Sequence, residues 1–338
     1  MYHPRLYGSF YDMGYKYGNL LHKKAGFKLP HIETRQKDFG EESMVELQRF
    51  YPEIMDEIYG FADGIKDHPY NVASFLLSLV AFDYNGRCSV FAFKNRDSMV
   101  IGRNYDMLFQ FKKFTESSLI APTNKLAYIS QSDVFIGRSD GINEKGVFIA
   151  MSFVNGTTIQ PGVSFHFIVR KVLENAYNIE EAITIIKKAK AASSNNFLIA
   201  DANGDMAIVE SAPEKTHVIK PTEGKAYLHI TNQFASKEMQ PYDKGKVGWS
   251  KSIERYQGIY QSLKELSKLD LQKAKEILSD PCVCLNLRQE KFGTIWSVVA
   301  ELNSLTIERA ETKPRITNYK TETRLDWWLK KQSKKLDK

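Results

Sequence analysis

One cysteine in the sequence stands where a nucleophile could be generated. Cys88 follows Arg87 and the turn signal Asn85-Gly86, and it opens the apolar run CSVFAF, which is typical of a buried strand. More than eighty residues precede it. Cleavage before residue 88 would place a thiol and a new α-amine on the same residue. The alternative is a buried thiol with no chemical role.

The strand after Cys88 is expected to bring an arginine beside the thiol. CSVFAF and SMVIGRNYDM are separated by the polar turn KNRDS, and a two-residue loop at Asn95-Arg96 would pair Cys88 with Arg103. Asp106 lies three residues further on and could accept a hydrogen bond from a nearby amine or thiol. Because a fixed cation favours the thiolate, we expect a lowered pKa for Cys88. This combination is typical of a nucleophilic site.

Helical spacing of apolar residues dominates the first 87 positions. Ser9 and Asp12 resemble a capping box before the first helical segment. The expected helices are 10–25, 44–65 and 71–82.

From Cys88 onward, strands predominate and helices occur only between groups of strands. Asn203-Gly204 predicts a two-residue hairpin turn, and residues 294–310 predict another hairpin. Helices are expected after Asn178, capped with Glu181, and over residues 250–266. Without a repeating βαβ order, this pattern favours antiparallel sheets in a layered α+β fold. We expect one such domain, residues 88–338, preceded by a helical segment, residues 1–87.

Composition narrows the function classes. A 338-residue chain with 43% hydrophobic residues can bury a large core. Its start lacks the features of a signal peptide, it contains no apolar run long enough for a membrane helix, and its three cysteines cannot form a disulfide framework. We therefore expect a cytoplasmic protein without membrane insertion. The net charge of +7 is concentrated partly in the basic tail LKKQSKKLDK, and no nucleic-acid motif accompanies it.

Several segments, in order, resemble the choloylglycine hydrolase and penicillin V acylase superfamily of N-terminal-nucleophile hydrolases. RCSVFAF and GRNYDM resemble the start of its mature chain, SDGINEKGVFIAM its next strand-turn-strand, and NNFLIADANGDMAIVE, HITNQF and SKSIERYQ its later elements. GSFYDMGYKYG and YPEIMDEIYGFADGI resemble the prosegment of autoproteolytic acyltransferases related to isopenicillin N acyltransferase. The resemblance implies an αββα sandwich of two antiparallel sheets between helical layers.

The resemblance also implies roles for five residues. Cys88 would be the nucleophile, exposed by self-cleavage after Arg87, with its α-amine as the general base. Arg103 and Asp106 match the charged pair that holds the thiol and the amine. Asn232 matches a donor of the oxyanion hole, and Arg255 matches a supporting arginine on a helix.

The implied reaction is cleavage of a linear amide through an acyl-thioester on Cys88. Its substrates would be small N-acyl compounds of the bile-salt, penicillin V or N-acyl amino acid type, or an amine would accept the acyl group. No metal or organic cofactor is needed for this chemistry. We further expect a homo-oligomer and no nucleic-acid partner.

Two positions depart from the resemblance. Arg87 precedes the nucleophile where many relatives have glycine, and Phe153 occupies the place of a second oxyanion asparagine, with Asn155 two residues away.

Three alternatives remain open at this stage. One is a papain-like set of Cys88, His229 and Asn232 in an intact chain. Another is a non-catalytic binding protein that kept the fold and lost processing. The third is a metal site at Cys282-x-Cys284.

Overall fold

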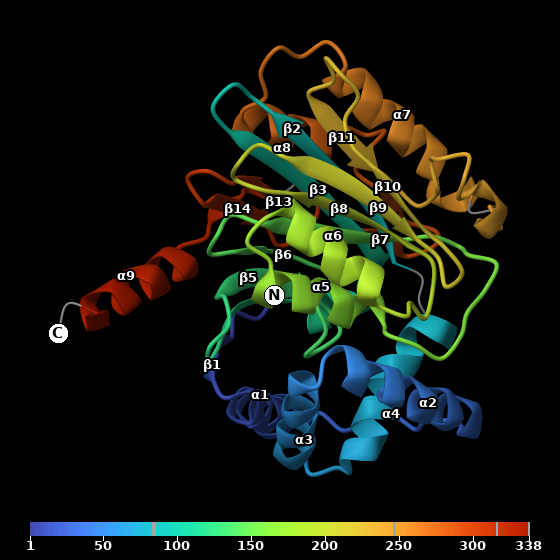
Figure 1. Cartoon of the computed structure of the whole chain (residues 1–338), viewed down its shortest axis with the longest axis vertical. Coiled ribbons are helices and arrows are strands. Elements are labelled where there is room, and N and C mark those ends of the chain that lie inside the picture. Colours follow the sequence, from blue (N-terminus) through green and yellow to red (C-terminus); the bar gives the residue numbers. More distant parts are fainter. Residues whose placement is uncertain (83–85, 246–247, 316, 337–338) are drawn as a thin grey trace.

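Two stacked β-sheets form the centre of the computed structural model, which describes residues 1–82, 86–245, 248–315 and 317–336 (Figure 1). The first sheet, sheet A, has the strand order β1-β4-β5-β6-β7-β8-β9-β10. Its neighbours are antiparallel except for β1 and β4. Its strands are β1 (Arg5–Gly8), β4 (Glu116–Pro122), β5 (Tyr128–Ser132), β6 (Asp140–Asn143), β7 (Phe148–Phe153), β8 (Asn195–Ala200), β9 (Met206–Ser211) and β10 (Thr216–Ile219).

The second sheet, sheet B, carries Cys88 near the start of its strand β2. Its strand order is β11-β2-β3-β13-β14-β15, with β12 also paired to β13, and every neighbouring pair is antiparallel. Its strands are β2 (Arg87–Lys94), β3 (Met99–Leu108), β11 (Tyr227–Ile230), β12 (Asn286–Leu287), β13 (Phe292–Glu301), β14 (Thr306–Ala310) and β15 (Lys320–Thr321).

A helical layer covers the outer face of each sheet. Helices α5 (Phe165–Asn175) and α6 (Ile179–Lys188) pack on sheet A, whereas α7 (Ser252–Leu263) and α8 (Leu271–Ser279) pack on sheet B. Strands β2 and β11 contact β7, β8 and β9 across the interior. The layers therefore follow the order helix, sheet, sheet, helix, which is the expected αββα architecture (Figure 1).

The N-terminal segment forms a group of four helices at one end of the sandwich (Figure 1). The expected helix 44–65 is wrong as one element, since it is divided between two helices at Tyr51 and Pro52. The segment is not purely helical either, because β1 pairs with β4 of sheet A. Its helices are α1 (Phe10–Ala25), α2 (Thr34–Phe50), α3 (Glu53–Ile65) and α4 (Pro69–Phe82).

The turn after β2 differs from the predicted register. Cys88 pairs with Tyr105 instead of Arg103, because residues 95–98 form a wider loop in which the Asn95 N–H donates to the Ser98 carbonyl over 2.8 Å. The shift is two residues, so each side chain stays on the predicted face of the sheet. The hairpin at Gly204 is confirmed, also with a wider turn than expected, closed between Asp201 and Asp205.

Buried charges connect the N-terminal helices to the rest of the chain. The Arg170 guanidinium on α5 donates to Glu57 of α3 over 2.9 Å and to Glu174 over 2.8 Å, and all three side chains are buried. Tyr51 also donates to Glu174. Removing either partner of such a pair would leave an uncompensated buried charge.

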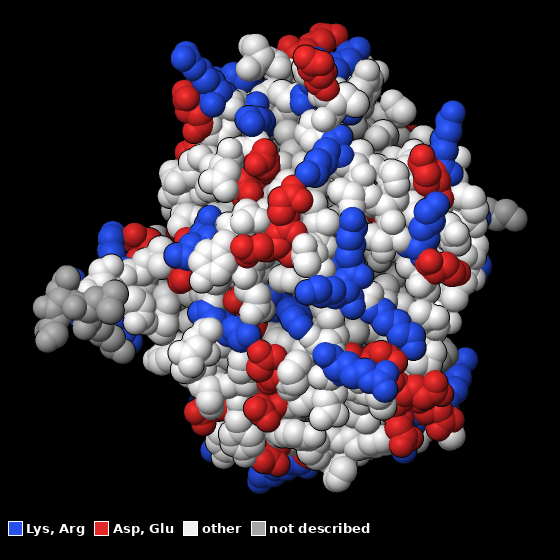
Figure 2. Space-filling view, viewed as in Figure 1, with Lys and Arg blue, Asp and Glu red and all other residues white. Residues whose placement is uncertain are grey.

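The C-terminal end forms helix α9 (Arg324–Leu336), where a solvated basic tail was expected, and the helix extends away from the sandwich (Figure 1). Arg324 anchors its start by donating to the Ser117 carbonyl of β4 over 2.7 Å. On the face in Figure 2, basic and acidic side chains are interspersed. None of the described helices is long and apolar enough to cross a bilayer. The remaining elements are the 3-10 helices η1 (Phe109–Phe114), η2 (Gln240–Tyr242) and η3 (Gly248–Ser250).

We predict that Glu57→Gln lowers the free energy of unfolding by about 3 kcal/mol, because part of the charge on Arg170 loses its buried counterion. Denaturant unfolding followed by circular dichroism measures this change. The control is Glu180→Gln, which removes an exposed pair with Lys220 and should change stability by less than about 1 kcal/mol. Equal effects of the two substitutions would contradict the prediction.

Candidate active site

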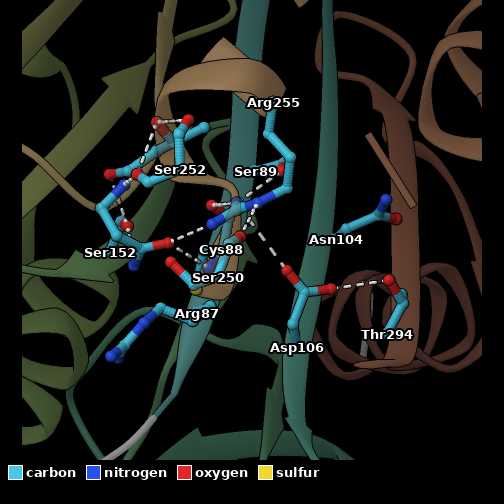
Figure 3. A network of polar contacts seen from close by, with 12 residues as sticks. Arg87, Cys88, Ser89, Asn104, Asp106, Ser152, Ser250, Ser252, Arg255 and Thr294 are labelled. Carbon is cyan, nitrogen blue, oxygen red and sulfur yellow. Dashed lines mark hydrogen bonds and ion pairs between the residues drawn. The ribbon is translucent and has the colours of Figure 1, made fainter. Parts of the chain in front are cut away.

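Polar groups from β3, from α7 and from the segment after β11 meet at Cys88. Figure 3 shows Arg255 and Asp106 beside it. The Sγ atom lies 3.3 Å from Nη2 of Arg103. The Cys88 N–H donates to Oδ1 of Asn232 over 3.2 Å, and its carbonyl accepts from Nη1 of Arg255 at 2.5 Å. The thiol and both backbone groups of one residue are therefore held by three of the side chains that the sequence predicts.

The intact chain does not favour the thiolate. Cys88 is fully buried, and burial raises the pKa of its thiol to about 11, although the Arg103 guanidinium acts in the opposite direction. The expected lowering of this pKa is therefore wrong for the uncleaved chain. Loss of solvent disfavours the charged thiolate more than one arginine, already paired with a carboxylate, stabilises it.

Arg103 is fixed by a carboxylate that was not among the predicted site residues. Its Nη1 lies 2.6 Å from Oδ2 of Asp140 on β6 and donates to the Ser139 carbonyl over 2.6 Å. Arg103 and Asp106 form no direct ion pair with each other, because each has other partners. Asp140 is the one Asp of the quoted segment SDGINEKGVFIAM, which was the available signal.

Asp106 lies at the end of β3 and contacts a different strand and helix. Thr294 on β13 donates to its Oδ1 over 2.6 Å, and Nη1 of Arg255 lies 3.8 Å from its Oδ2. Burial raises the pKa of Asp106 to about 6, with Arg255 opposing the shift. Asp106 therefore carries a negative charge near Cys88 that depends on pH within the physiological range.

Asn232 holds the Cys88 backbone through its carbonyl oxygen. Its amide orientation follows from its neighbours, since Arg255 can only donate to Oδ1, at 2.7 Å, and the Phe153 carbonyl can only accept from Nδ2, at 2.9 Å. Nδ2 also donates to Ser152 over 2.9 Å. The donor expected for an oxyanion hole is thus present but already bonded in the intact chain.

Ser152 and Ser252 are further polar partners of Asn232 that sequence reasoning missed. Oγ of Ser252 accepts the Asn232 N–H at 2.8 Å, while Ser152 Oγ donates to the Thr231 carbonyl at 2.7 Å. Ser252 is the first residue of the Ser-x-x-Arg pattern in the quoted segment SKSIERYQ, which was the available signal, whereas Ser152 has no distinctive one. Asn155, the alternative oxyanion residue, donates its side-chain amide to the Gly245 carbonyl over 3.1 Å.

Arg255 reaches from α7 to β2, where it contacts Cys88 and Ser89 (Figure 3). Besides Cys88 and Asn232, it donates to Ser89 Oγ over 2.9 Å and to the Ser250 carbonyl over 3.0 Å. The side chain is fully buried. It therefore holds the backbone at Cys88 from the helical layer, as its predicted supporting role requires.

Arg87 is buried between aromatic rings beside Cys88. Its guanidinium carbon lies 5.1 Å from the Trp249 ring centre and 5.8 Å from that of Phe153, and Nη1 donates to the Gly86 carbonyl over 2.9 Å. Such positions permit cation–π attraction. The turn predicted at Asn85-Gly86 includes Asn85, which lies outside the described residues.

His229 does not join the site. It pairs with Phe91 on β2, three residues from Cys88, so the two side chains lie on opposite faces of sheet B. Its ring packs on Tyr256 with the ring centres 4.0 Å apart, and burial lowers its pKa to about 4. The papain-like alternative is therefore not supported by the geometry.

The other cysteines differ in burial. Cys284 is buried and Cys282 is exposed. Among the described residues, no three His, Cys, Asp or Glu side chains are grouped as they would be around a metal ion.

The fold is shared with solved N-terminal-nucleophile hydrolases. Two variants of the conjugated bile acid hydrolase from Clostridium perfringens match with a TM-score of 0.50, at 15% and 16% identity, each over 70% of this chain and 96% of that chain. Penicillin V acylase from Agrobacterium tumefaciens matches with a TM-score of 0.48 at 16% identity, over 69% of this chain and 84% of that chain. At these identities the first two matches establish the αββα class of fold alone.

A family model gives the closer assignment. The model of the acyl-coenzyme A:6-aminopenicillanic acid acyl-transferases matches residues 91–315, well over half of the chain. The chain therefore belongs to this family, in agreement with the superfamily and branch expected from the sequence. A search of curated protein sequences returned no match.

We predict that Asp106 makes the stability of the intact chain depend on pH. Because its folded-state pKa is raised to about 6, the folded state binds a proton more tightly than the unfolded state does, so Asp106 lowers stability as pH rises from about 4 to 6. Asp106→Asn in the uncleaved Cys88→Ala background should flatten this decline. Unfolding midpoints measured across that range provide the test, and an unchanged slope would contradict it.

Proposed function

We propose that this protein is a self-processing cysteine hydrolase of linear amides, with Cys88 as the nucleophile. The observation that carries the proposal is the hold on one residue: Arg103 contacts the thiol, Asn232 binds the N–H and Arg255 binds the carbonyl. A buried structural cysteine also needs partners for its backbone, but it does not need a guanidinium at its thiol. Membership of an acyl-transferring family agrees with this chemistry.

The first reaction is cleavage of the chain itself. Sγ of Cys88 attacks the carbonyl carbon of Arg87, the C–N bond breaks, and the thiol proton goes to the departing nitrogen. Water then hydrolyses the thioester, releasing the Arg87 carboxylate and restoring the thiol. The hydrogen bond from the Cys88 N–H to Asn232 holds the nitrogen in place during this exchange.

Turnover then uses the new α-amine. A free α-amine titrates near 8, so it can take the thiol proton at working pH and return it to the leaving amine. The thiolate attacks the acyl carbon of the substrate, and water resolves the resulting thioester. Nδ2 of Asn232, which must first release Ser152 or the Phe153 carbonyl, and backbone amides stabilise the oxyanion, where one such donor is worth about 3–4 kcal/mol of barrier.

The remaining site residues position this machinery. Arg103, held by Asp140, compensates the thiolate charge. Arg255 keeps Asn232 and the Cys88 backbone in place, and Asp106 balances Arg255 while it attracts the α-ammonium form. No step in this scheme requires a cofactor.

The proposal divides the chain into a prosegment, residues 1–87, and a catalytic domain, residues 88–338. The buried pair of Glu57 with Arg170 joins the two pieces, so we expect both to remain in one particle after cleavage. The partner is a small N-acyl amide of the bile-salt, penicillin V or N-acyl amino acid type. A cytoplasmic location and a homo-oligomer remain part of the proposal.

We predict that purified protein consists of fragments of 87 and 251 residues, divided between Arg87 and Cys88. Intact-mass spectrometry measures this directly. Cys88→Ala should remain whole because the attacking sulfur is lost, whereas Cys284→Ala, which removes another buried thiol, should still be cleaved.

An uncleaved wild-type chain would contradict this prediction. An uncleaved wild-type chain that hydrolyses amides would exclude the α-amine as the base. An uncleaved chain without activity would favour a non-catalytic binding protein.

Acyl transfer to an amine is the second candidate, favoured by the description of the family. The thioester on Cys88 would then be resolved by an amine instead of water. We predict that, when a primary amine is added together with an N-acyl substrate, the N-acylated form of that amine appears in proportion to the amine concentration. Mass spectrometry measures this product. Free acid as the sole product at every amine concentration would assign the protein as a hydrolase.

A further inference from the structure

A cavity of about 500 Å³ lies at the boundary between the N-terminal segment and the rest of the chain. The N-terminal segment contributes Tyr17, Leu20 and Lys24 of α1, and the 3-10 helix η1 contributes Lys113 and Phe114. Mostly apolar cavities of this size are typical of small-molecule sites. None of the five site residues predicted from the sequence lines it, so it is separate from the candidate active site.

The buried part of the cavity wall joins the two parts of the chain. The Tyr17 hydroxyl on α1 donates to the Glu116 carboxylate at the start of β4, and both residues line the cavity. Glu116 also pairs with the buried Arg138, and Ser118 donates to it over 2.9 Å. The negative charge of Glu116 is therefore compensated within the fold.

Two aromatic side chains continue this wall across the boundary. Phe27, which follows α1, contacts Phe135 in the loop between β5 and β6, with the ring centres 4.7 Å apart. Both rings line the cavity and both are only partly buried. A molecule bound in the cavity would therefore contact residues on both sides of position 88 at once.

The outer part of the cavity exposes apolar side chains to water. Tyr2, Leu20 and Phe114 line it, and they are 57%, 43% and 39% exposed. Exposed apolar side chains that gather in one place mark binding surfaces more often than scattered ones do. Because covering such surface is favourable in water, the cavity is suited to an apolar ligand.

Two lysines determine which charge such a ligand would carry. Lys24 lies in the last turn of α1 and Lys113 in η1, and both are exposed. Lys113 Nζ lies 4.9 Å from the ring centre of Phe114. In the part of the chain that the structure describes, neither ammonium group forms an ion pair, whereas His3, a further basic lining residue, lies 3.1 Å from Glu311. A carboxylate is therefore the complementary head group.

We propose that this cavity is a binding site for an anionic single-chain amphiphile, with its alkyl chain against the aromatic wall and its carboxylate bound by Lys24 and Lys113. The inference does not depend on the proposed function, because neither cleavage nor the Cys88 thiol takes part. A ligand that contacts both parts of the chain binds only when they are docked, so it stabilises their association.

Calorimetric titration of the full-length wild type with sodium octanoate tests this site directly. Octanoate should bind, octylammonium chloride should bind at least about tenfold more weakly because its charge is repelled by the lysines, and acetate should bind too weakly to measure. The same octanoate affinity is expected for Cys88→Ala, which removes the proposed nucleophile. Equal affinity for octanoate and octylammonium would overturn the inference.

Substitutions at exposed positions locate the bound octanoate. Leu20→Asp places a carboxylate in the cavity, and the double variant Lys24→Gln, Lys113→Gln removes both cations, so each should weaken octanoate binding roughly tenfold. The matched controls are Val45→Asp and Lys23→Gln, which lie at exposed positions of α2 and α1 outside the cavity and should bind octanoate like the wild type. Circular dichroism confirms that each variant is folded.

Thermal unfolding provides a second measurement. Octanoate should raise the unfolding midpoint of the wild type and of Cys88→Ala, and should raise that of Leu20→Asp far less. Unchanged octanoate affinity in both cavity variants would show that octanoate binds elsewhere, and the inference would be wrong. If the variants behave as expected while the wild type hydrolyses no amide, the proposed function fails and this site stands.

Discussion

A single buried guanidinium, that of Arg255, connects the elements that form the site. It enters from α7 and binds the backbone carbonyl of Cys88, Oδ1 of Asn232 and Oγ of Ser89. Strand β2, the segment that follows β11 and the outer helical layer therefore share one set of hydrogen bonds. An arginine is always charged and its donors are fixed in one plane. Moving one of these contacts would therefore disturb the others.

The same principle extends through the interior of the protein. Arg103, Arg138 and Arg170 are fully buried, and each has a buried carboxylate partner. Charges in a low-dielectric interior are strongly destabilising when unpaired, so such pairs restrict the arrangement of the elements that carry them. At Cys88, the positive charge of Arg103 does not offset the effect of burial, which raises the pKa of the thiol to about 11. The intact chain thus holds the Cys88 thiol in place but largely protonated.

The sequence predicted the elements of this site better than its pairings. Turn residues and apolar alternation predicted β2 and β3. Their register depends on the number of residues in the loop 95–98, and the composition of the loop does not specify that number. Because the register shift is two residues, Arg103 stays on the same face of sheet B as Cys88, and the contact between the two side chains is kept. Asp140 was missed as the partner of Arg103, because it lies on the other sheet and only the stacking of the two sheets brings them together. The helix break at Pro52 was readable from the missing N–H of proline.

Strand β1 affects how the proposed two-chain form would unfold and refold. It borders β4 at the end of sheet A, so residues before the cleavage site supply the edge strand of a sheet formed otherwise by residues after it. In the uncleaved chain this strand is tethered and reaches β4 at a high effective concentration. After cleavage, unfolding would release it as a separate molecule and leave the edge of β4 unpaired and open to association with other chains. Folding would then be an event that the chain completes once, because after cleavage refolding would require two separate molecules to associate.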